Sequence, residues 1–358
     1  MSLTLLIPTL NRAAFVERAL RYYGQAGFRG IVSLGDSSEP EQAEKIRRAV
    51  QAVEGQLQVE YRSFPSPPYT SNAPVLLEMA QAATTPYVVY AGDDDFLIPN
   101  TLEQCTRYLD DHPDHSAAHG LSLVIRLGHE GAYGPITQVN YMEGHVLKSE
   151  SAAERWQGYA RHALSTQYYV HRRETWLRMY QDVATVPIQY WGTEFLPCSL
   201  SAVAGKIHEV DRLSCIFQVN SNRQFGWTTH SMYQLALEPR WSEALRAMRA
   251  FIVQAIAETD QRPSSEAEQI VDKELWRHLM IMLQAHYDDR YDPGNWFSNF
   301  KARFPWLVQL VRILRQVRRN HYRRLSLHQL LDPRHPSHAD FIPVYQLITT
   351  GPYKNDLA

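Results

Sequence analysis

The sequence is short of several features that mark particular classes of protein. It has three widely spaced cysteines among 358 residues, Cys105, Cys198 and Cys215, which indicates reduced thiols and offers no zinc-binding spacing. No apolar run is long enough to cross a bilayer, and no basic and apolar leader precedes the first strand-like segment. The net charge of −2 gives no sign of a nucleic-acid partner. These absences predict a cytoplasmic protein, and the inner face of a membrane stays open as its location.

Glycine-rich phosphate loops are also missing. No G-x-G-x-x-G follows the first strand and no G-x-x-x-x-G-K occurs, so a bound phosphate would need a metal ion. Asp93, Asp94 and Asp95 follow the apolar run 87–90 and Gly92, which predicts an acidic turn at the carboxyl end of a buried strand. Adjacent carboxylates repel one another and are best tolerated around a cation. The alternative is an acidic surface turn in which Asp95 caps the next helix.

Strand-like and helix-like segments alternate through the first hundred residues. This alternation predicts an α/β fold with a mainly parallel sheet flanked by helices and joined by right-handed crossovers. The strand-like runs lie at 3–9, 30–34, 57–62 and 87–90. Ligands bind such sheets at the carboxyl ends of the strands. Thr9 and Asp36, which end the first two runs, are therefore expected near the three aspartates, at the edge of a nucleotide crevice.

Three motifs in this half resemble those of family 2 glycosyltransferases in their order and spacing. They are Ile7–Arg12, Ile31–Ser38, and Gly92–Asp95 followed by Pro99. The resemblance covers roughly residues 3 to 220 and looks closest to a bacterial subgroup of the family. It implies a GT-A-type fold, also called the nucleotide-diphospho-sugar transferase fold, and an enzyme that inverts the anomeric centre of a nucleotide-sugar.

The resemblance also implies roles for individual residues. Nucleotide-sugar binding falls to Pro8, Thr9, Asn11, Arg12, Asp36 and Asp93. Among these, Thr9 and Asp36 would contact the base, and Asp93 would contact the ribose or a metal-bound water. Asp94 would bind the divalent metal, Mn²⁺ or Mg²⁺. Asp95 is a neighbouring metal candidate whose role is left open.

Two departures from the family pattern affect the donor assignment more than the fold. The usual second-strand pattern is two acids, a glycine and a serine. In this chain Gly35 replaces the first acid and Ser37 replaces the glycine. The Arg-Asn pair often found before the helix that leads to the acidic strand is also missing, and Val75–Leu77 occupies that region.

Gln189–Phe195 is the second stretch with chemical content, because an aromatic pair and a glycine precede a carboxylate at the start of an apolar helix. In the family an acid at this position is the general base, so the resemblance implies that role for Glu194. A carboxylate beside an apolar wall can have its pKa raised toward working pH. Trp191 is expected to stack on a sugar face. The alternative for Glu194 is a favourable charge at a helix N-terminus.

A polar and aromatic loop is expected at 220–230. Loops at this point often fold over the donor in the family. Arg223 would then neutralise the departing diphosphate, and His230 would complete the metal shell or bind phosphate. The chain has 15 histidines, so a structural role is the alternative for His230.

The pattern becomes helical from Ser231 onward. We therefore predict a GT-A-like domain at 1–230, with a nucleotide-binding half at 1–112 and an acceptor half at 113–230, and a helical domain at 231–358. The segment Lys301–Leu331 holds eight basic residues and no acid. Its apolar stripe within 305–325 predicts a basic amphipathic helix that lies on an anionic membrane, or one that packs on a core with its basic face in solvent.

These patterns predict a metal-dependent, inverting glycosyltransferase of the hexosyltransferase type. It would move a sugar from a UDP- or GDP-type donor to a hydroxyl of a saccharide or lipid-linked acceptor, in bacterial surface polysaccharide or glycolipid synthesis. One alternative is a sugar nucleotidyltransferase, which should carry a glycine- and arginine-rich loop where this chain has Asn11–Ala14. The other is a degenerate domain that binds a nucleotide-sugar without turnover.

Overall fold

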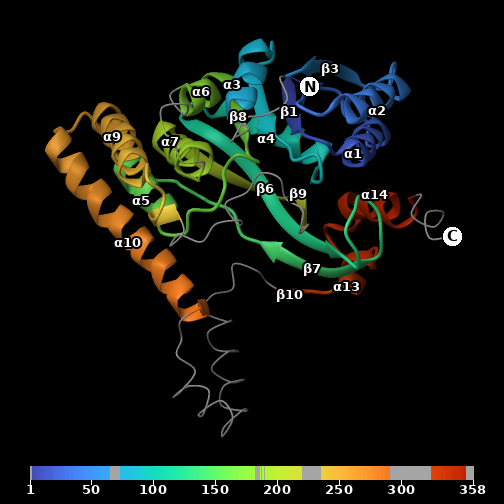
Figure 1. Cartoon of the computed structure of the whole chain (residues 1–358). Helices are drawn as coiled ribbons and strands as arrows, with labels where there is room; N and C mark the ends of the chain where they lie inside the picture. Colours follow the sequence, from blue (N-terminus) through green and yellow to red (C-terminus); the bar gives the residue numbers. More distant parts are fainter. Residues whose placement is uncertain are drawn as a thin grey trace, which may run out of the picture.

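The computed structural model describes residues 2–64, 73–181, 186, 188, 190–219, 235–290 and 324–351. Within these ranges ten strands form one mixed sheet with helices on both faces (Figure 1). The strands are β1 (Leu3–Thr9), β2 (Ile31–Asp36), β3 (Gln58–Ser63), β4 (Tyr87–Tyr90), β5 (Phe96–Leu97), β6 (His115–Leu127), β7 (Ile136–Met142), β8 (Val170–Arg172), β9 (Lys206–Val219) and β10 (Arg324–Leu325). The helices are α1 (Ala13–Gln25), α2 (Pro40–Ala52), α3 (Ala73–Ala82), α4 (Pro99–Asp111), α5 (Ala152–Ala160), α6 (Arg173–Tyr180), η2 (Tyr190–Phe195, a π-helix), α7 (Leu196–Ala204), α9 (Trp241–Asp260), α10 (Ser264–Arg290), α13 (Leu327–Leu331) and α14 (His338–Thr349).

The N-terminal half of the sheet is parallel, in the order β3-β2-β1-β4. β1 and β2 are buried along almost their whole length because helices cover both faces, as continuous apolar runs require. In the register of this half, Thr9 is paired with Asp36, and Asp36 with Ser63. Three strands therefore end side by side.

The second half of the sheet mixes strand directions. β8 lies antiparallel between β4 and β6, and β6 then pairs with β7 antiparallel and with β9 in parallel. β9 also carries the short strand β5, which directly follows the acidic turn. The long strands β6 and β9 thus connect the acidic turn to the far part of the sheet (Figure 1).

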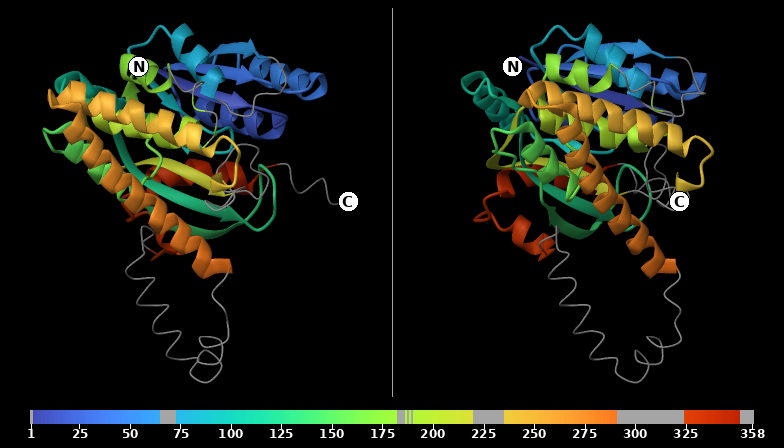
Figure 2. Two further views of the ribbon diagram at one scale, coloured as in Figure 1. Left: turned by 60° about the vertical axis from the view of Figure 1, so that its left-hand side comes forward. Right: turned by 90° about the vertical axis from the view of Figure 1, so that its left-hand side faces the viewer.

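The helices after residue 235 pack on earlier parts of the chain. α9 and α10 lie side by side and bury an apolar core against α5 and α7 (Figure 2). α13 and α14 lie beside β7 and α1 and contribute Leu330, Phe341, Val344 and Ile348 to the main core. In the part of the chain that the structure describes, no helix is both long and apolar enough to span a bilayer.

Candidate functional site

The ends of β1 and β2 are fastened together by short polar contacts. The backbone N–H of Ser37 donates to the carbonyl of Thr9 over 3.0 Å. Asn11 has a positive φ of 57°, a conformation that asparagine tolerates better than most residues. In that conformation its N–H donates to the hydroxyl of Ser38 over 2.7 Å, and its side-chain oxygen accepts from the N–H of Glu39 over 2.8 Å. Asn11 therefore holds two strand ends in place.

The three aspartates form a tight turn between β4 and β5, and all three are buried. Gly92 makes this turn possible, because a Cβ at that position would lie 2.4 Å from Oδ2 of Asp95 and 3.0 Å from Oδ1 of Asp94. The backbone N–H of Asp95 donates to the carbonyl of Gly92 over 3.2 Å and closes the turn. The predicted acidic turn at the end of a buried strand is thus present, with its carboxylates folded inward.

Arg12 joins two of these carboxylates. Its Nη1 lies 2.8 Å from Oδ1 of Asp93, and its Nη2 lies 2.8 Å from Oδ2 of Asp94. The hydroxyl of Thr9 donates to the other oxygen of Asp93 over 2.7 Å. The motif at the end of β1 and the acidic turn, about eighty residues apart in sequence, therefore meet in one site.

The electrostatics of this cluster follow from its burial. Burial raises the pKa of Asp93 to about 7, with a further contribution from the charge of Asp94, while Arg12 and Thr9 act in the opposite direction. Burial alone would lower the pKa of Arg12, but the charges of Asp93 and Asp94 outweigh it and raise that pKa. The guanidinium is therefore the cation that compensates these two acids.

Asp95 is bound to other segments of the chain and serves the frame of the site. Its Oδ2 accepts from the hydroxyl of Tyr168 over 2.7 Å, and its Oδ1 accepts from the backbone N–H of Gln218 on β9 over 2.9 Å. With both oxygens engaged in this way, Asp95 fixes the turn to the neighbouring strands.

Arg18 stands behind the acidic turn and is fully buried. Its Nη2 donates to the carbonyl of Asp94 over 2.7 Å, and its Nη1 donates to the side chain of Gln218 over 2.5 Å and to the carbonyl of Ala132. Its guanidinium also lies over the ring of Phe96, 4.6 Å from the ring centre. A buried arginine that is hydrogen-bonded here supplies positive potential to the turn from inside the protein.

The surroundings of Gly35 and Asp36 explain why the motif at the end of β2 departs from the family pattern. A Cβ on Gly35 would lie 2.6 Å from the sulfur of Met79 and 3.0 Å from Val75, so this face of β2 has no room for the acid of the family pattern. Asp36 faces the other way and is 1% exposed. It accepts hydrogen bonds from the hydroxyl of Tyr61 and the N–H of Ser38, each over 2.8 Å.

Glu194 lies in the π-helix η2, immediately before α7. Short π-helical segments are rare and often occur at functional sites. The side chain of Glu194 is partly exposed, and its charge acts on the buried Tyr159, Tyr180 and Tyr190. Burial raises the pKa of Tyr190 and of Tyr180, and the negative charge of Glu194 adds to both shifts.

Two adjacent residues connect η2 to the acidic turn. The side-chain amide of Gln167 donates to the carbonyl of Thr193 over 2.5 Å, next to Glu194. Its backbone carbonyl accepts from the N–H of Tyr90 at the end of β4 over 3.3 Å. The neighbouring Tyr168 binds Asp95, as described above. The segment that carries Glu194 is therefore held in a fixed relation to the strand that carries the aspartates.

The expectation that Trp191 stacks on a sugar face is wrong. Its side chain is completely buried and packs against Tyr190, Phe195 and Trp241. The apolar helix α7 and the later helix α9 close over the indole. Trp191 is part of the core that supports η2.

Two predicted site residues, Arg223 and His230, lie outside the described residues, as does most of the basic stretch 305–325. Among the residues that are described, no three His, Cys, Asp or Glu side chains are grouped so that they could hold a metal ion. Asp93 and Asp94 nevertheless present one oxygen each to the same positive group, Arg12. Two carboxylates and the oxygens of a bound diphosphate are a normal ligand set for Mg²⁺, so the donor chemistry of this pair fits a divalent cation once the guanidinium is displaced.

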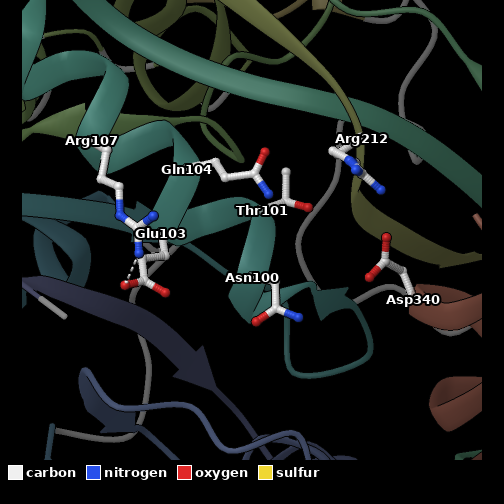
Figure 3. Close-up of a pocket in the computed structure, with 7 residues that line it drawn as sticks. All are labelled: Asn100, Thr101, Glu103, Gln104, Arg107, Arg212 and Asp340. Carbon is white, nitrogen blue, oxygen red and sulfur yellow. Dashed lines mark hydrogen bonds and ion pairs between the residues drawn. The ribbon is translucent and has the colours of Figure 1, made fainter.

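A separate polar pocket of about 320 Å³ lies between α4, β9 and α14 (Figure 3). Its lining consists of Asn100, Thr101, Glu103, Gln104, Arg107, Arg212 and Asp340. None of the predicted site residues takes part in it. The candidate site is therefore defined by the strand ends and not by this pocket.

Several residues of the site were not singled out from the sequence: Arg18, Gln167, Tyr168 and Gln218. Arg18 occupies a helix that carries other charged residues, and its sequence neighbourhood gives no sign that it turns inward. Gln167, Tyr168 and Gln218 come from distant segments that only the folded sheet brings to the acidic turn. No sequence signal that we recognise marks these three.

No protein-family model matches the sequence, and no curated protein matches it. Solved structures do match the fold. Residues 1–349 of TarS from S. aureus, in complex with UDP-GlcNAc, align with a TM-score of 0.53 at 13% identity, covering 82% of this chain and 77% of that one. The same fragment in complex with UDP gives a TM-score of 0.51 at 12% identity, covering 81% and 75%.

A mannosyltransferase from Pyrobaculum calidifontis, in complex with GDP-Man and Mn²⁺, covers 84% of both chains at 13% identity, but its TM-score of 0.42 supports no argument. At these identities the TarS structures establish the fold alone. The predicted GT-A-type α/β sheet, followed by a helical C-terminal part, is confirmed.

Proposed function

We propose that this protein is an inverting glycosyltransferase of family 2 that transfers a hexose from a UDP- or GDP-linked donor to an acceptor hydroxyl. The observation that carries the proposal is the meeting of Thr9 and Arg12 with Asp93 and Asp94 at the carboxyl edge of the sheet. That edge is where α/β sheets bind nucleotides. The confirmed fold supports the proposal, since a GT-A-type sheet is the expected frame for such a site.

In the proposed donor site, the end of β2 receives the nucleotide base. Asp36 accepts two hydrogen bonds at present, but each carboxylate oxygen has two acceptor positions and can take an N–H of the base in addition. Thr9 and Pro8 form the adjoining wall, and Asn11 holds the two strand ends at a fixed separation. Asp93, which follows the next strand of the sheet, is proposed to contact the ribose or a metal-bound water.

The diphosphate would lie over the acidic turn. Asp94, with Asp93 and the diphosphate oxygens, would hold a Mn²⁺ or Mg²⁺ ion there, and such an ion neutralises the charge that develops on a departing diphosphate. Arg12 lies at the same place and presents a planar pair of N–H donors suited to phosphate oxygens. Arg18 adds positive potential from behind. Charge stabilisation of this kind commonly contributes more to catalysis than any other single effect.

Glu194 is the proposed general base. An acceptor hydroxyl must lose its proton as it attacks the anomeric carbon from the face opposite the nucleotide. A partly exposed carboxylate beside buried tyrosines can reach an acceptor hydroxyl and take its proton. Gln167 is hydrogen-bonded both to η2 and to the end of β4, so it fixes the distance between the proposed base and the proposed donor site.

The acceptor is proposed to be a saccharide or a lipid-linked saccharide of the bacterial surface. An acid-free, basic stretch at 301–331 supports contact with an anionic membrane, where each basic residue contributes about 1 kcal/mol. We further propose the division into a GT-A-like part at 1–230 and a mainly helical part at 231–358, although β10, α13 and α14 of the second part pack with the sheet of the first. Arg223 is still proposed to neutralise the departing diphosphate, and His230 to complete the metal shell or bind phosphate.

Turnover measurements test the proposal. The protein is incubated with UDP- and GDP-linked hexoses and a panel of saccharide acceptors, and released UDP or GDP is quantified by chromatography with and without MnCl₂. We expect release with one nucleotide class. Replacement Glu194→Gln should lower the rate by about a hundredfold or more. Glu174→Gln is the matched control, because Glu174 is also an acid near a helix start but is exposed. Release from no donor would favour the degenerate-domain alternative, and an unchanged Glu194→Gln rate would remove Glu194 as the base.

A further inference from the structure

Arg12 occupies the position where the proposed function needs a metal ion. Each of its two terminal nitrogens lies 2.8 Å from a different carboxylate, one on Asp93 and one on Asp94. The arginine side chain is 15% exposed, and the two acids are 5% and 13% exposed. One guanidinium thus bridges the two oxygens that the proposed metal site would use.

This arrangement differs from most ion pairs of the described residues, which lie on the surface. Arg107 and Glu103 on α4 are a typical surface pair, with side chains 69% and 44% exposed. A buried ion pair is weak evidence for stability, because desolvation of the charges offsets much of their attraction. The Arg12 cluster therefore needs a reason other than stability, and its location at the edge of the sheet suggests one.

The two arginines of the site differ in their freedom to move. Arg18 is fully buried and holds backbone and side-chain oxygens on three separate segments, so it is fixed. Arg12 stands at the N-terminal boundary of α1, is partly exposed, and bonds side chains rather than the backbone frame. Its guanidinium also lies over the ring of Phe15, 4.1 Å from the ring centre. Arg12 is the movable cation of the pair.

We propose that Arg12 is a placeholder for the metal, and that it transfers to the diphosphate when the donor binds. This inference rests on the proposed function. Without donor, the guanidinium neutralises Asp93 and Asp94 and keeps a divalent cation away. A diphosphate is negatively charged like the two carboxylates, and it offers Arg12 an alternative partner for a bidentate interaction. Once Arg12 has turned to the phosphate, the two carboxylates accept the divalent cation, which the phosphate oxygens also ligate.

The consequence is a reciprocal coupling between the cation and the nucleotide. A divalent cation alone must compete with Arg12 and binds weakly, whereas in the presence of nucleoside diphosphate Arg12 no longer competes with it for Asp93 and Asp94. By thermodynamic linkage the cation must then tighten nucleotide binding by the same factor. The protein thereby avoids holding a metal ion in the absence of its substrate.

Calorimetric titration of MnCl₂ alone into the full chain tests the placeholder role without any turnover. Arg12→Gln should bind Mn²⁺ at least about tenfold more tightly than the wild type, because the competing bidentate cation is gone. Arg12→Lys keeps a positive charge but not the planar fork, so its Mn²⁺ affinity should fall between the two. It also serves as a second variant if Arg12→Gln folds poorly. Arg107→Gln, which removes an exposed arginine, should bind as the wild type does.

Two further arms separate the possible outcomes. Asp94→Asn in the Arg12→Gln background should abolish the gained Mn²⁺ binding, which locates it at the acidic turn. Titrations of Mn²⁺ with UDP or GDP present should show stronger coupling between metal and nucleotide in the wild type than in Arg12→Gln. Equal Mn²⁺ affinity in the wild type and Arg12→Gln would overturn the inference. Tighter Mn²⁺ binding by Arg12→Gln with no nucleotide binding by any variant would refute the proposed function and the transfer to phosphate, and would still support Arg12 as the occupant of the metal position.

Discussion

The hydroxyl of Thr9 donates a hydrogen bond to the carboxylate of Asp93 over 2.7 Å. Thr9 ends β1 and Asp93 follows the end of β4, its parallel neighbour in the sheet. This contact, together with the bridge from Arg12 to the same acid, fixes the spacing between the first motif and the acidic turn. The geometry of the proposed donor site depends on it.

Thr9→Val should therefore lower the free energy of unfolding by about 1–3 kcal/mol, because it removes a hydrogen-bond donor from a buried carboxylate. Thr9→Ser keeps the hydroxyl and should recover most of this loss. Urea unfolding of the three proteins, followed by circular dichroism, measures the difference. Equal stabilities of Thr9→Val and the wild type would mean that the Thr9–Asp93 contact is not maintained in solution.

Gly35 offers a test of why this chain departs from the family pattern. Gly35→Ala should destabilise the fold by about 1–3 kcal/mol, because the new methyl group would overlap the sulfur of Met79. Gly35→Asp, which restores the acid of the family pattern, should destabilise the fold more than Gly35→Ala does, because it also buries a charge. It should not improve nucleotide binding.

A double variant is the control for this explanation. Met79→Ala in the Gly35→Ala background removes the atom that the new methyl group would meet. The double variant should therefore lose less free energy of unfolding than the two single variants lose in sum. Strict additivity in urea unfolding, or a Gly35→Asp protein as stable as the wild type, would contradict the steric account.

Gln167 should act on turnover through the position of Glu194. Gln167→Leu removes the hydrogen bond to the carbonyl of Thr193. We expect kcat to fall by about tenfold or more while the affinity for the donor nucleotide changes little, since misplacement of a base costs rate more than binding. Steady-state kinetics and nucleotide titration separate the two effects. A change confined to nucleotide affinity would show that Gln167 serves the donor site instead.

Buried histidines should make the protein sensitive to acid. Burial lowers the pKa of His171 to about 4, although the ring lies in hydrogen-bonding distance of the carbonyl of Tyr169 and the hydroxyl of Ser201. In the unfolded chain a histidine has a pKa of about 6.5. Between these two values the unfolded state binds a proton that the folded state does not, so stability falls as the pH drops from about 6.5 toward 4.

One such histidine can lower the free energy of unfolding by at most about 1.4 kcal/mol for each pH unit of acidification. Denaturant unfolding at several pH values should show that His171→Gln has a shallower decline in this window than the wild type. His328→Gln, which replaces an exposed histidine, is the control. A decline of equal slope in His171→Gln would assign the acid sensitivity to other groups.

The strands and the acidic turn could be predicted from the sequence because their signals are local. The run Tyr87–Tyr90 consists of aromatic and β-branched residues, Gly92 follows it, and three acids come next. Consecutive residues therefore indicate both the strand and its polar end. The rule that ligands bind at the carboxyl ends of parallel strands then placed Thr9 and Asp36 near the aspartates. The structure brings Thr9 to Asp93 and places Asp36 in register with Thr9.

The supporting residues could not be predicted because their roles depend on contacts between distant segments. Arg18 is one of several charged residues on α1, and only the packing of β9 and the segment at Ala132 against α1 encloses it. Trp191 was expected at the ligand because aromatic residues line sugar sites, yet α9, fifty residues later, covers it. Local patterns identify strands and turns, while burial is decided by the whole fold.

The most direct test of the central claim is a calorimetric titration of UDP and of GDP into the protein, each with Mn²⁺ and with EDTA. The account predicts that one nucleotide binds in the presence of Mn²⁺, that EDTA weakens this binding, and that Asp94→Asn abolishes the metal dependence. Asp111→Asn, an exposed acid at the end of α4, should behave as the wild type. Binding of neither nucleotide, or metal-dependent binding that survives Asp94→Asn unchanged, would contradict the donor site at the acidic turn.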